Sequence, residues 1–319
     1  MSLDGQTLVI TGATSGFGLA IARLAARRGA RLLLVARSGP SLARVAATLG
    51  AEATWVAVDV ADPEQVRAIE ARAVERYGGF DGWIHAAGVG LHAPVLRTAE
   101  AAHRRLFEVN FWGTLHCVRL AAHHLRDKGG AIVVVSSILG DRALPWQGAI
   151  SAAEHARKAW CDALRMELRH DRVPVRITVL QPGGFDTPFS RRAATPMGRR
   201  ATVPPPLYHP DVLARAALRC LRSPHRDLVL GDSTPVALEK FAPRLGDRLL
   251  AAVVGRRLRT AEAGDGALYV PHPPEGVVRA RPRRPVLRHS LRAALALHRL
   301  PVLLAATSAA GAALLARRT

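Results

Sequence analysis

The sequence contains 319 residues, 49% of them hydrophobic, and carries a formal net charge of +20. This hydrophobic content is sufficient for a large core, and the length suits one α/β domain followed by a tail. The three cysteines are widely spaced and form no Cys-x-x-Cys pair, which argues against disulfides and structural zinc and fits a reducing cytoplasm. We expect no signal peptide, because the first predicted strand begins within a few residues of Met1.

The positive charge is concentrated after residue 190 and is carried almost entirely by arginine. A basic C-terminal portion can contact anionic lipid, nucleic acid or an acidic partner. The short Arg-Pro-rich run at 281–285 gives little support to nucleic-acid binding, and we expect none.

Strands and helices alternate along the predicted chain. We expect strands at 8–10, 30–35, 53–58, 82–85, 131–135, 175–180 and 227–230, and helices beginning at 19 and spanning 62–77, 100–126, 148–170, 211–222 and 235–254. The strands are continuous apolar runs, which are typical of strands buried on both faces. The fold class is therefore α/β, a Rossmann-type doubly wound parallel sheet with helices on both faces, plus a C-terminal tail.

The glycine-rich stretch from Thr11 to Gly18 lies at the first strand-to-helix turn. Gly12 permits a tight turn, Gly16 would let a pyrophosphate approach the backbone, and Gly18 lets the helix pack closely on the strand. The alternative is a glycine turn without a ligand, but its position at the first turn of a long αβ alternation favours a phosphate site.

The second predicted strand ends in Ala36-Arg37. An acidic residue at this strand end would bind the ribose hydroxyls of NAD, whereas an arginine suits the 2′-phosphate of NADP. Arg37 and the missing acid at Ala36 therefore favour NADP(H) over NAD(H). The alternative is a solvated surface arginine.

With these motifs the chain resembles the short-chain dehydrogenase/reductase family over roughly residues 5–232. The matching motifs are Thr-Gly-x-x-x-Gly-x-Gly, Asp59-Val60, Ala86-Ala87-Gly88, Asn110, Ser137 and Pro182-Gly183-x-x-x-Thr187. The resemblance implies an oxidoreductase whose cofactor site includes Thr11, Gly12, Ser15, Gly16, Phe17, Gly18, Arg37, Ala87, Gly88, Pro182 and Gly183. It also implies that Asp59 and Val60 meet the adenine, and that Phe185 and Thr187 touch the nicotinamide carboxamide.

The resemblance fails at the catalytic helix. The family uses Asn and Ser with a Tyr and a Lys four residues apart, where Tyr is the general acid/base and Lys lowers its pKa and holds the ribose. Asn110 and Ser137 stand at their expected places, but Ile150 replaces the Tyr and Glu154 replaces the Lys. The sequence has no Tyr-x-x-x-Lys elsewhere, and Lys158, one turn further along, could reach back only in part.

The replacements at Ile150 and Glu154 both work against proton transfer and ribose binding as the family performs them. Isoleucine has no proton to give, and Glu154 puts a negative charge where a cation should hold the ribose; losing positioned acid/base help costs about 10²–10⁴ in rate. One interpretation is an NADP(H)-binding oxidoreductase with weak or atypical activity on a carbonyl or alcohol. Another is a non-catalytic dinucleotide-binding pseudoenzyme, acting as a scaffold or redox sensor. A third is a membrane-associated platform protein. His85, where the family has Asn, is expected to bond to the backbone and not to act in catalysis.

The remaining expectations concern the loop, the tail and assembly. Residues 184–209 are predicted to be a mobile substrate loop, whose Arg191, Arg192, Arg199 and Arg200 meet an acidic substrate or solvent. The predicted units are a Rossmann domain at 1–255, a Pro- and Arg-rich linker at 256–290, and an apolar helix at 291–319. The stretch 300–316 is at the short limit for a membrane span, so it is expected to anchor the protein, lie at a membrane surface or dock on protein.

The protein is expected to be cytoplasmic, with possible membrane association only through this tail. By the same resemblance we predict a homodimer or tetramer that pairs through the helices after the fourth and fifth strands, which carry Leu106, Leu115, Leu164 and Leu168. We also expect a small-molecule substrate, and a site near a membrane would favour a lipophilic one. We expect no bound metal.

Overall fold

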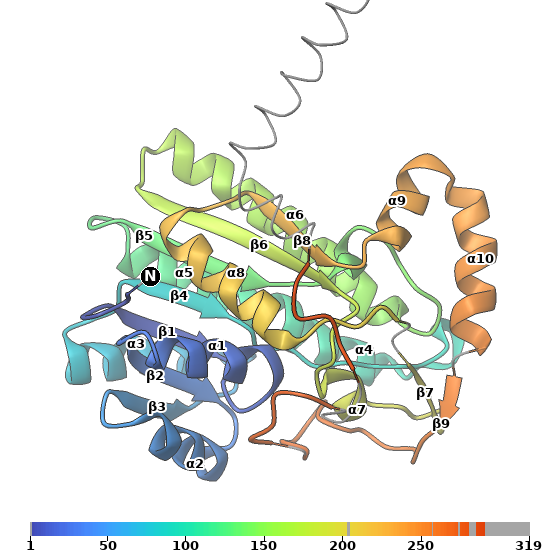
Figure 1. Ribbon diagram of the computed structural model, residues 1–319, viewed down its shortest axis with the longest axis horizontal. Coiled ribbons are helices and arrows are strands. Elements are labelled where there is room, and N and C mark those ends of the chain that lie inside the picture. Colours follow the sequence, from blue (N-terminus) through green and yellow to red (C-terminus); the bar gives the residue numbers. More distant parts are fainter. Residues whose placement is uncertain (1, 203–204, 257, 274, 281–284, 291–319) are drawn as a thin grey trace, which may run out of the picture.

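Seven parallel strands form the central sheet of the computed structural model, in the order β3-β2-β1-β4-β5-β6-β8 (Figure 1). The structure describes residues 2–202, 205–256, 258–273, 275–280 and 285–290. The strand order reverses between β1 and β4, which opens the crevice where ligands bind in doubly wound sheets. The strands are β1 (Thr7–Thr11), β2 (Arg31–Ala36), β3 (Ala53–Ala57), β4 (Gly82–His85), β5 (Gly130–Val135), β6 (Val175–Gly183) and β8 (Asp227–Gly231).

Both faces of the sheet are buried under helices except at the edge strand β3, which was expected to be buried on both faces but whose side chains are half-buried or exposed because only β2 pairs with it. Side chains of β1 and β2 alternate between two hydrophobic clusters, with Val9 and Leu33 in one and Leu8 and Leu32 in the other. This confirms the predicted Rossmann-type doubly wound sheet. The first cluster is covered by α3 (Pro63–Tyr77), α4 (Glu100–Phe107), α5 (Gly113–His124) and α6 (Gly148–His170), and the second by α1 (Gly16–Ala26), α2 (Gly39–Leu49) and α8 (Pro210–Arg222).

Local sequence signals explain where several helices begin and break. The Asp62 carboxylate accepts hydrogen bonds from the main-chain N–H groups of Glu64 and Gln65 and so caps α3. The single helix predicted over 100–126 is divided by a π-helical turn at Glu108–Trp112 that carries Asn110. This turn directs the Asn110 side chain toward the end of β4, where it bonds to Val89.

The region after β8 differs from the prediction. The helix expected over 235–254 is two helices, α9 (Thr234–Phe241) and α10 (Pro243–Arg256). Proline has no N–H to continue a helix and disfavours helical backbone at the preceding residue, so the chain breaks before Pro243. β7 (Arg199–Ala201) and β9 (Leu258–Thr260) pair antiparallel, which ties the 184–209 loop, including the short α7 (Phe189–Arg192), to the segment after α10.

The four leucines named for subunit pairing pack inside their own chain. Leu106 and Leu115 are buried in the cluster beneath α4 and α5, and Leu164 and Leu168 are half-buried against the same cluster. The large apolar side chains that these helices expose are Trp112, at the end of the π-helical turn, and Met166 on α6. The leucines therefore supply core packing, and a pairing surface on these helices would have to use other residues.

Part of the expected linker at 256–290 folds back along the carboxyl ends of β1 and β2 (Figure 1). We call residues 264–273 and 275–280 the C-terminal strap. Its Leu268 is fully buried, and the Gly276 N–H donates to the Thr14 carbonyl at 2.7 Å. In the described part of the chain no helix combines the length and apolar character needed to cross a membrane. The segment 300–316 lies outside the described residues.

Candidate functional site

Three adjoining hollows run along the carboxyl edge of the sheet, where the predicted site residues end. One of about 230 Å³ lies beside Ser137 and Ile150, a second of about 90 Å³ beside Ser15 and Gly16, and a third of about 60 Å³ beside Arg37. Gly88 lines all three, so they are neighbours, and we call them together the groove. Their order matches a dinucleotide laid across the strand-order reversal, with the nicotinamide at Ser137 and the adenosine at Arg37.

The glycine turn has the close approaches that its sequence predicted. Gly12 has a φ of 68°, and a Cβ there would lie 2.5 Å from the Ala86 carbonyl oxygen. A Cβ on Gly18 would lie 2.3 Å from the carbonyl oxygen of Gly12, so both glycines are required by packing. Gly16 differs, because the nearest atoms to its would-be Cβ are side-chain atoms at an ordinary contact distance of 3.6 Å, so its φ of 53° favours glycine there more than packing does.

Thr11 and His85 hold the turn from inside. The Thr11 hydroxyl accepts the N–H groups of Ala86 and Ala87 at 3.0 and 3.1 Å, which joins β1 to the turn after β4. His85 is fully buried between the hydroxyls of Thr11 and Thr114, and burial lowers its pKa to about 3. Its partners are thus side-chain hydroxyls and not the backbone groups that we expected. Its neutral ring serves as a structural link, in keeping with the expected non-catalytic role.

Asn110 and Ser137 are both brought to the groove. The Asn110 amide exchanges two hydrogen bonds with the Val89 backbone, at 2.9 and 3.0 Å, and its own main-chain carbonyl accepts the Thr114 hydroxyl at 2.7 Å. The Ser137 hydroxyl accepts the Leu139 N–H at 3.1 Å and lines the 230 Å³ cavity. Both residues therefore line the same cavity.

Helix α6 presents Ile150 to this cavity, and Glu154 is buried one turn further on. The Glu154 carboxylate accepts the Ser136 hydroxyl at 2.6 Å and the Arg157 guanidinium at 3.2 Å. Arg157 is itself buried and donates to the carbonyl oxygens of Asn110 and Val135.

Sequence reasoning missed Arg157, and its presence changes one expectation. We predicted a negative charge at the position where a cation should hold the ribose, but the Arg157 guanidinium pairs with the Glu154 carboxylate and neutralises it. The Glu-x-x-Arg spacing on one helix face was the available signal. Lys158 does not reach back toward Glu154, because its ammonium pairs with Asp141 at 3.3 Å.

His92 is a second residue that sequence reasoning missed. It lines the 230 Å³ cavity and is only 4% exposed, and its Nδ1 has no hydrogen-bond partner among the residues that the structure describes. Burial lowers its pKa to about 4, so the ring is neutral at pH 7. A neutral imidazole in this wall can donate one hydrogen bond to a substrate oxygen. No periodicity or motif around residue 92 signals this position.

At the nicotinamide end, Phe17, Phe185 and Thr187 line the same cavity, as do Pro182 and Gly183 at the end of β6. The rings of Phe17 and Phe185 meet edge to face at 5.2 Å between centroids, which makes this wall apolar and rigid. The loop arginines separate into two groups. Arg191 and Arg200 line an adjacent hollow of about 410 Å³, whereas Arg192 bonds to the Ser15 hydroxyl.

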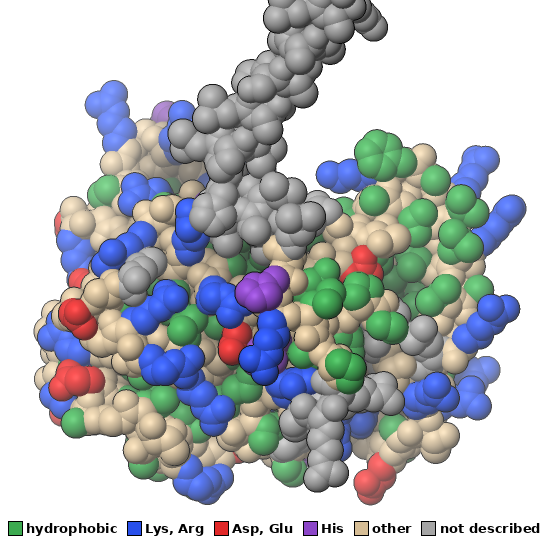
Figure 2. All heavy atoms as spheres, viewed as in Figure 1, with side chains coloured by type: hydrophobic (Ala, Val, Ile, Leu, Met, Phe, Trp, Pro, Cys, Tyr) green, Lys and Arg blue, Asp and Glu red, His purple; other side chains and the backbone are tan. Residues whose placement is uncertain are grey.

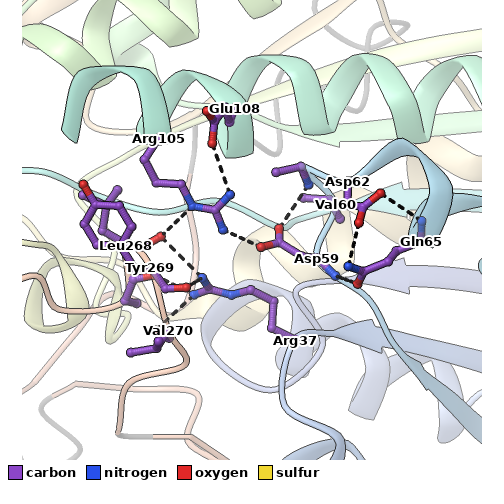
Figure 3. Close-up of polar contacts among 12 residues, drawn as sticks. Arg37, Asp59, Val60, Asp62, Gln65, Arg105, Glu108, Leu268, Tyr269 and Val270 are labelled. Carbon is purple, nitrogen blue, oxygen red and sulfur yellow. Dashed lines mark hydrogen bonds and ion pairs between the residues drawn. The ribbon is translucent and has the colours of Figure 1, made fainter. Parts of the chain in front are cut away.

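At the adenosine end, Arg37 is not a free surface side chain. Its guanidinium donates to the carbonyl oxygens of residues 267–270 in the strap, at 2.5 Å to Ala267 and 3.0 Å to Tyr269 (Figure 3). Asp59 pairs with Arg105 and accepts the Ala61 N–H at 3.1 Å, while Val60 beside it is buried. Burial lowers the pKa of Arg37, which Asp59 partly offsets.

Comparison with known proteins agrees with this geometry. The family sequence model described as "short chain dehydrogenase" matches residues 6–197. The chain is similar to the uncharacterized oxidoreductase YxnA of Bacillus subtilis, with 34% identity over 79% of this chain and 73% of that protein. It is also similar to the dehydrogenase/reductase SDR family member 7B of Bos taurus, with 32% identity over 77% of this chain and 80% of that protein.

Two solved structures share the fold. A short-chain dehydrogenase/reductase from Burkholderia phymatum, in complex with NAD, matches with a TM-score of 0.66 and 25% identity, over 78% of this chain and 96% of that one. An alcohol dehydrogenase from Thermococcus sibiricus, complexed with 5-hydroxy-NADP, matches with a TM-score of 0.60 and 28% identity, over 70% of this chain and 95% of that one.

Proposed function

We propose, on the premise that this chain belongs to the short-chain dehydrogenase/reductase family, that it binds NADP(H) and acts only weakly on a carbonyl or alcohol. The observation that carries the proposal is the pairing of a family cofactor groove with an isoleucine at the position of the proton donor. The glycine turn offers a phosphate site of the family kind, with Gly12 and Gly18 closely packed and Gly16 at the start of α1. When bound, the nicotinamide supplies or accepts the hydride.

The residues that line the cavity would position the substrate and exclude water. The Ser137 hydroxyl would hold the substrate oxygen, and the Asn110 amide would keep the wall beside the nicotinamide in place through its bonds to Val89. The Ile150 side chain can exclude water but cannot donate a proton. The proton on the product alcohol would then have to come from water, because the neutral ring of His92 can donate a hydrogen bond but has no acidic proton to transfer. Loss of a positioned acid costs about 10²–10⁴ in rate.

The preference for NADP(H) is supported by Arg37 and by the absence of an acid at Ala36. A guanidinium at this strand end can receive the 2′-phosphate through charge-assisted hydrogen bonds. The two structural relatives hold NAD in one case and an NADP derivative in the other, so they do not decide between the cofactors.

A second candidate function is a dinucleotide-binding pseudoenzyme that acts as a scaffold or redox sensor. The buried Glu154–Arg157 pair favours it, because both side chains are tied to core groups and neither is available to hold the ribose. The membrane-platform alternative depends on residues 300–316, outside the described part of the chain. Members of the family often oligomerise, and we propose a homodimer or tetramer for this chain.

An NADPH titration followed by a turnover assay on a panel of ketones tests the proposal. The unaltered protein should bind NADPH and reduce ketones far below the usual enzymatic range of about 1–10³ s⁻¹. A triple variant, Ile150→Tyr with Glu154→Lys and Arg157→Ala, restores the acid and the lysine and removes a guanidinium that would repel the new ammonium. We expect it to gain about 10²–10⁴ in rate.

The matched control carries Ile150→Phe in place of Ile150→Tyr, because Phe adds the same ring without the hydroxyl. An equal gain from the Phe control would show that cavity filling, and not proton donation, limits the reaction. Turnover by the unaltered protein at the usual enzymatic rate would mean that another residue donates the proton. Absence of NADPH binding would refute the proposed cofactor.

A further inference from the structure

The C-terminal strap is held against the cofactor groove at both of its ends. At one end the Thr195 N–H donates to the Gly264 carbonyl at 2.8 Å, and the Ala267 N–H donates to the Arg192 carbonyl at 2.7 Å. At the other end the Gly276 N–H donates to the Thr14 carbonyl at 2.7 Å. Figure 1 shows this segment passing below α1, at the carboxyl edge of the sheet. The strap is therefore bonded to the groove itself.

The strap uses the main-chain donor that a pyrophosphate would need. The Gly16 N–H, the first of α1, donates to the Val277 carbonyl at 3.0 Å. The first N–H groups of a helix have no partner within the helix and attract anions and carbonyl oxygens. Val277 thus satisfies the group that the glycine turn would offer to a phosphate.

The strap also places an acidic side chain at this end of the groove. The Glu275 carboxylate accepts the Ser41 hydroxyl and the Thr14 hydroxyl, the latter at 3.4 Å, and lies 3.9 Å from the Arg192 guanidinium. Its side chain is only 15% exposed. Its charge stabilises the protonated forms of Arg37 and Arg192, whose pKa values burial lowers. A carboxylate among two hydroxyls and two guanidinium groups stands where a phosphate would bind.

The strap occupies Arg37 as well. All four carbonyl oxygens of residues 267–270 accept hydrogen bonds from its guanidinium, and the Leu268 carbonyl also accepts one from Arg105 (Figure 3). A 2′-phosphate can reach Arg37 only by replacing these carbonyls.

The strap also lines the place where the adenosine half of a dinucleotide would lie. Pro271 and Glu275 of the strap line the hollow of about 60 Å³ beside Arg37. Because strap atoms already bond to the groups that would hold this half of the cofactor, the strap and the adenosine compete for the same place.

We propose that the C-terminal strap is an intrachain competitor of the cofactor, with the Glu275 carboxylate standing in for a cofactor phosphate. NADP(H) then binds only to molecules whose strap has withdrawn, and the observed affinity is reduced by the fraction of closed molecules. The inference rests on the proposed function, because it requires this groove to bind a dinucleotide.

The test measures NADPH binding to the full chain by calorimetry for the unaltered protein, for Glu275→Gln and for a control, Glu262→Gln. Glu262 is an exposed acid just before the strap, so its substitution removes the same charge without touching the groove. We expect Glu275→Gln to tighten NADPH binding about 10-fold and the control to leave it unchanged. Circular dichroism verifies that both variants remain folded.

Hydrogen–deuterium exchange supplies a second readout that does not depend on a substitution. Saturating NADPH should increase deuterium uptake in peptides covering 264–280. Decreased uptake would mean that the strap closes over the cofactor, and it would overturn the inference, as would equal NADPH affinity for Glu275→Gln and the unaltered protein. Weaker NADH binding by Glu275→Gln would also overturn it, because the carboxylate would then hold the ribose hydroxyls. NADPH binding by none of the proteins would refute the proposed function together with the inference.

Discussion

The buried pair of Glu154 and Arg157 makes a stability prediction that can be worked out from the structure. Glu154→Gln keeps the shape of the side chain and an acceptor for Ser136, but it removes the only carboxylate that pairs with Arg157 among the described residues. The side chains of the pair are 5% and 2% exposed, so the guanidinium would remain buried against the neutral carbonyls of Asn110 and Val135. Breaking such a pair by removing one partner costs about 3–5 kcal/mol.

Thermal unfolding followed by circular dichroism measures this cost. For a domain of this size class, about 2–4 °C in Tm corresponds to 1 kcal/mol, so Tm should fall by roughly 6–20 °C. The matched control is Glu100→Gln, which breaks an exposed pair with Arg104 and should cost no more than about 1 kcal/mol. Replacing both partners, as in Glu154→Gln with Arg157→Met, should recover part of the loss. A Tm decrease below 2 °C for Glu154→Gln would refute the reasoning.

Three further predictions concern the cofactor, the pH and assembly. Arg37→Ala should weaken NADPH binding about 10- to 100-fold more than NADH binding, since it removes a charge-assisted phosphate contact worth roughly 1.5–3 kcal/mol; equal losses for both cofactors would contradict the assigned role. The pKa of His85 is lowered from 6.5 to about 3 in the folded chain, so the unfolded chain binds a proton first and stability falls as the pH drops below 6.5. Urea denaturation should therefore show that the unaltered protein loses about 2–3 kcal/mol more stability between pH 7 and pH 4.5 than His85→Asn does. The same pH dependence of stability in both proteins would contradict a buried neutral ring at His85. Light scattering in mild detergent should give the mass of a dimer or tetramer, and a strictly monomeric mass would rule this out.

The fold and the site residues at the ends of the strands could be predicted, because the sequence patterns that indicate them span only a few neighbouring residues. Continuous apolar runs indicated strands buried on both faces, and the glycine spacing indicated a tight turn at Gly12 and a close helix-to-strand contact at Gly18. The break before Pro243 had a local signal as well, which a helical reading of 235–254 overlooked.

The remaining features depend on tertiary contacts between distant residues. The Arg37 guanidinium meets Ala267 across 230 positions of sequence, and nothing in the composition of the strap indicates where it lies. Arg157 has a local helix spacing to Glu154, yet its burial depends on carbonyls supplied by β5 and the π-helical turn. The orphaned ring nitrogen of His92 likewise follows from packing around the cavity and not from any pattern in its own loop.

Basic side chains, Lys and Arg together, are spread widely over the face shown in Figure 2, whereas the groups that bind the strap are partly buried in the groove. This distribution means that added salt should screen the exposed charges far more strongly than the partly buried contacts of the strap. Differences in NADPH affinity between the unaltered protein and Glu275→Gln should therefore persist at high salt.

The β7–β9 ladder gives the molecule a kinetic property. β9 ends at Thr260, only a few residues before the strap begins, and its partner β7 belongs to the loop beside the 410 Å³ hollow and the catalytic cavity. A strap that swings out would therefore pull on β9 and, through the ladder, on the wall of the substrate entrance. This coupling favours an ordered over a random sequence of the two binding events. We expect a compulsory sequence in which the dinucleotide enters first and departs last, so that a dead-end substrate analogue inhibits uncompetitively with respect to NADPH.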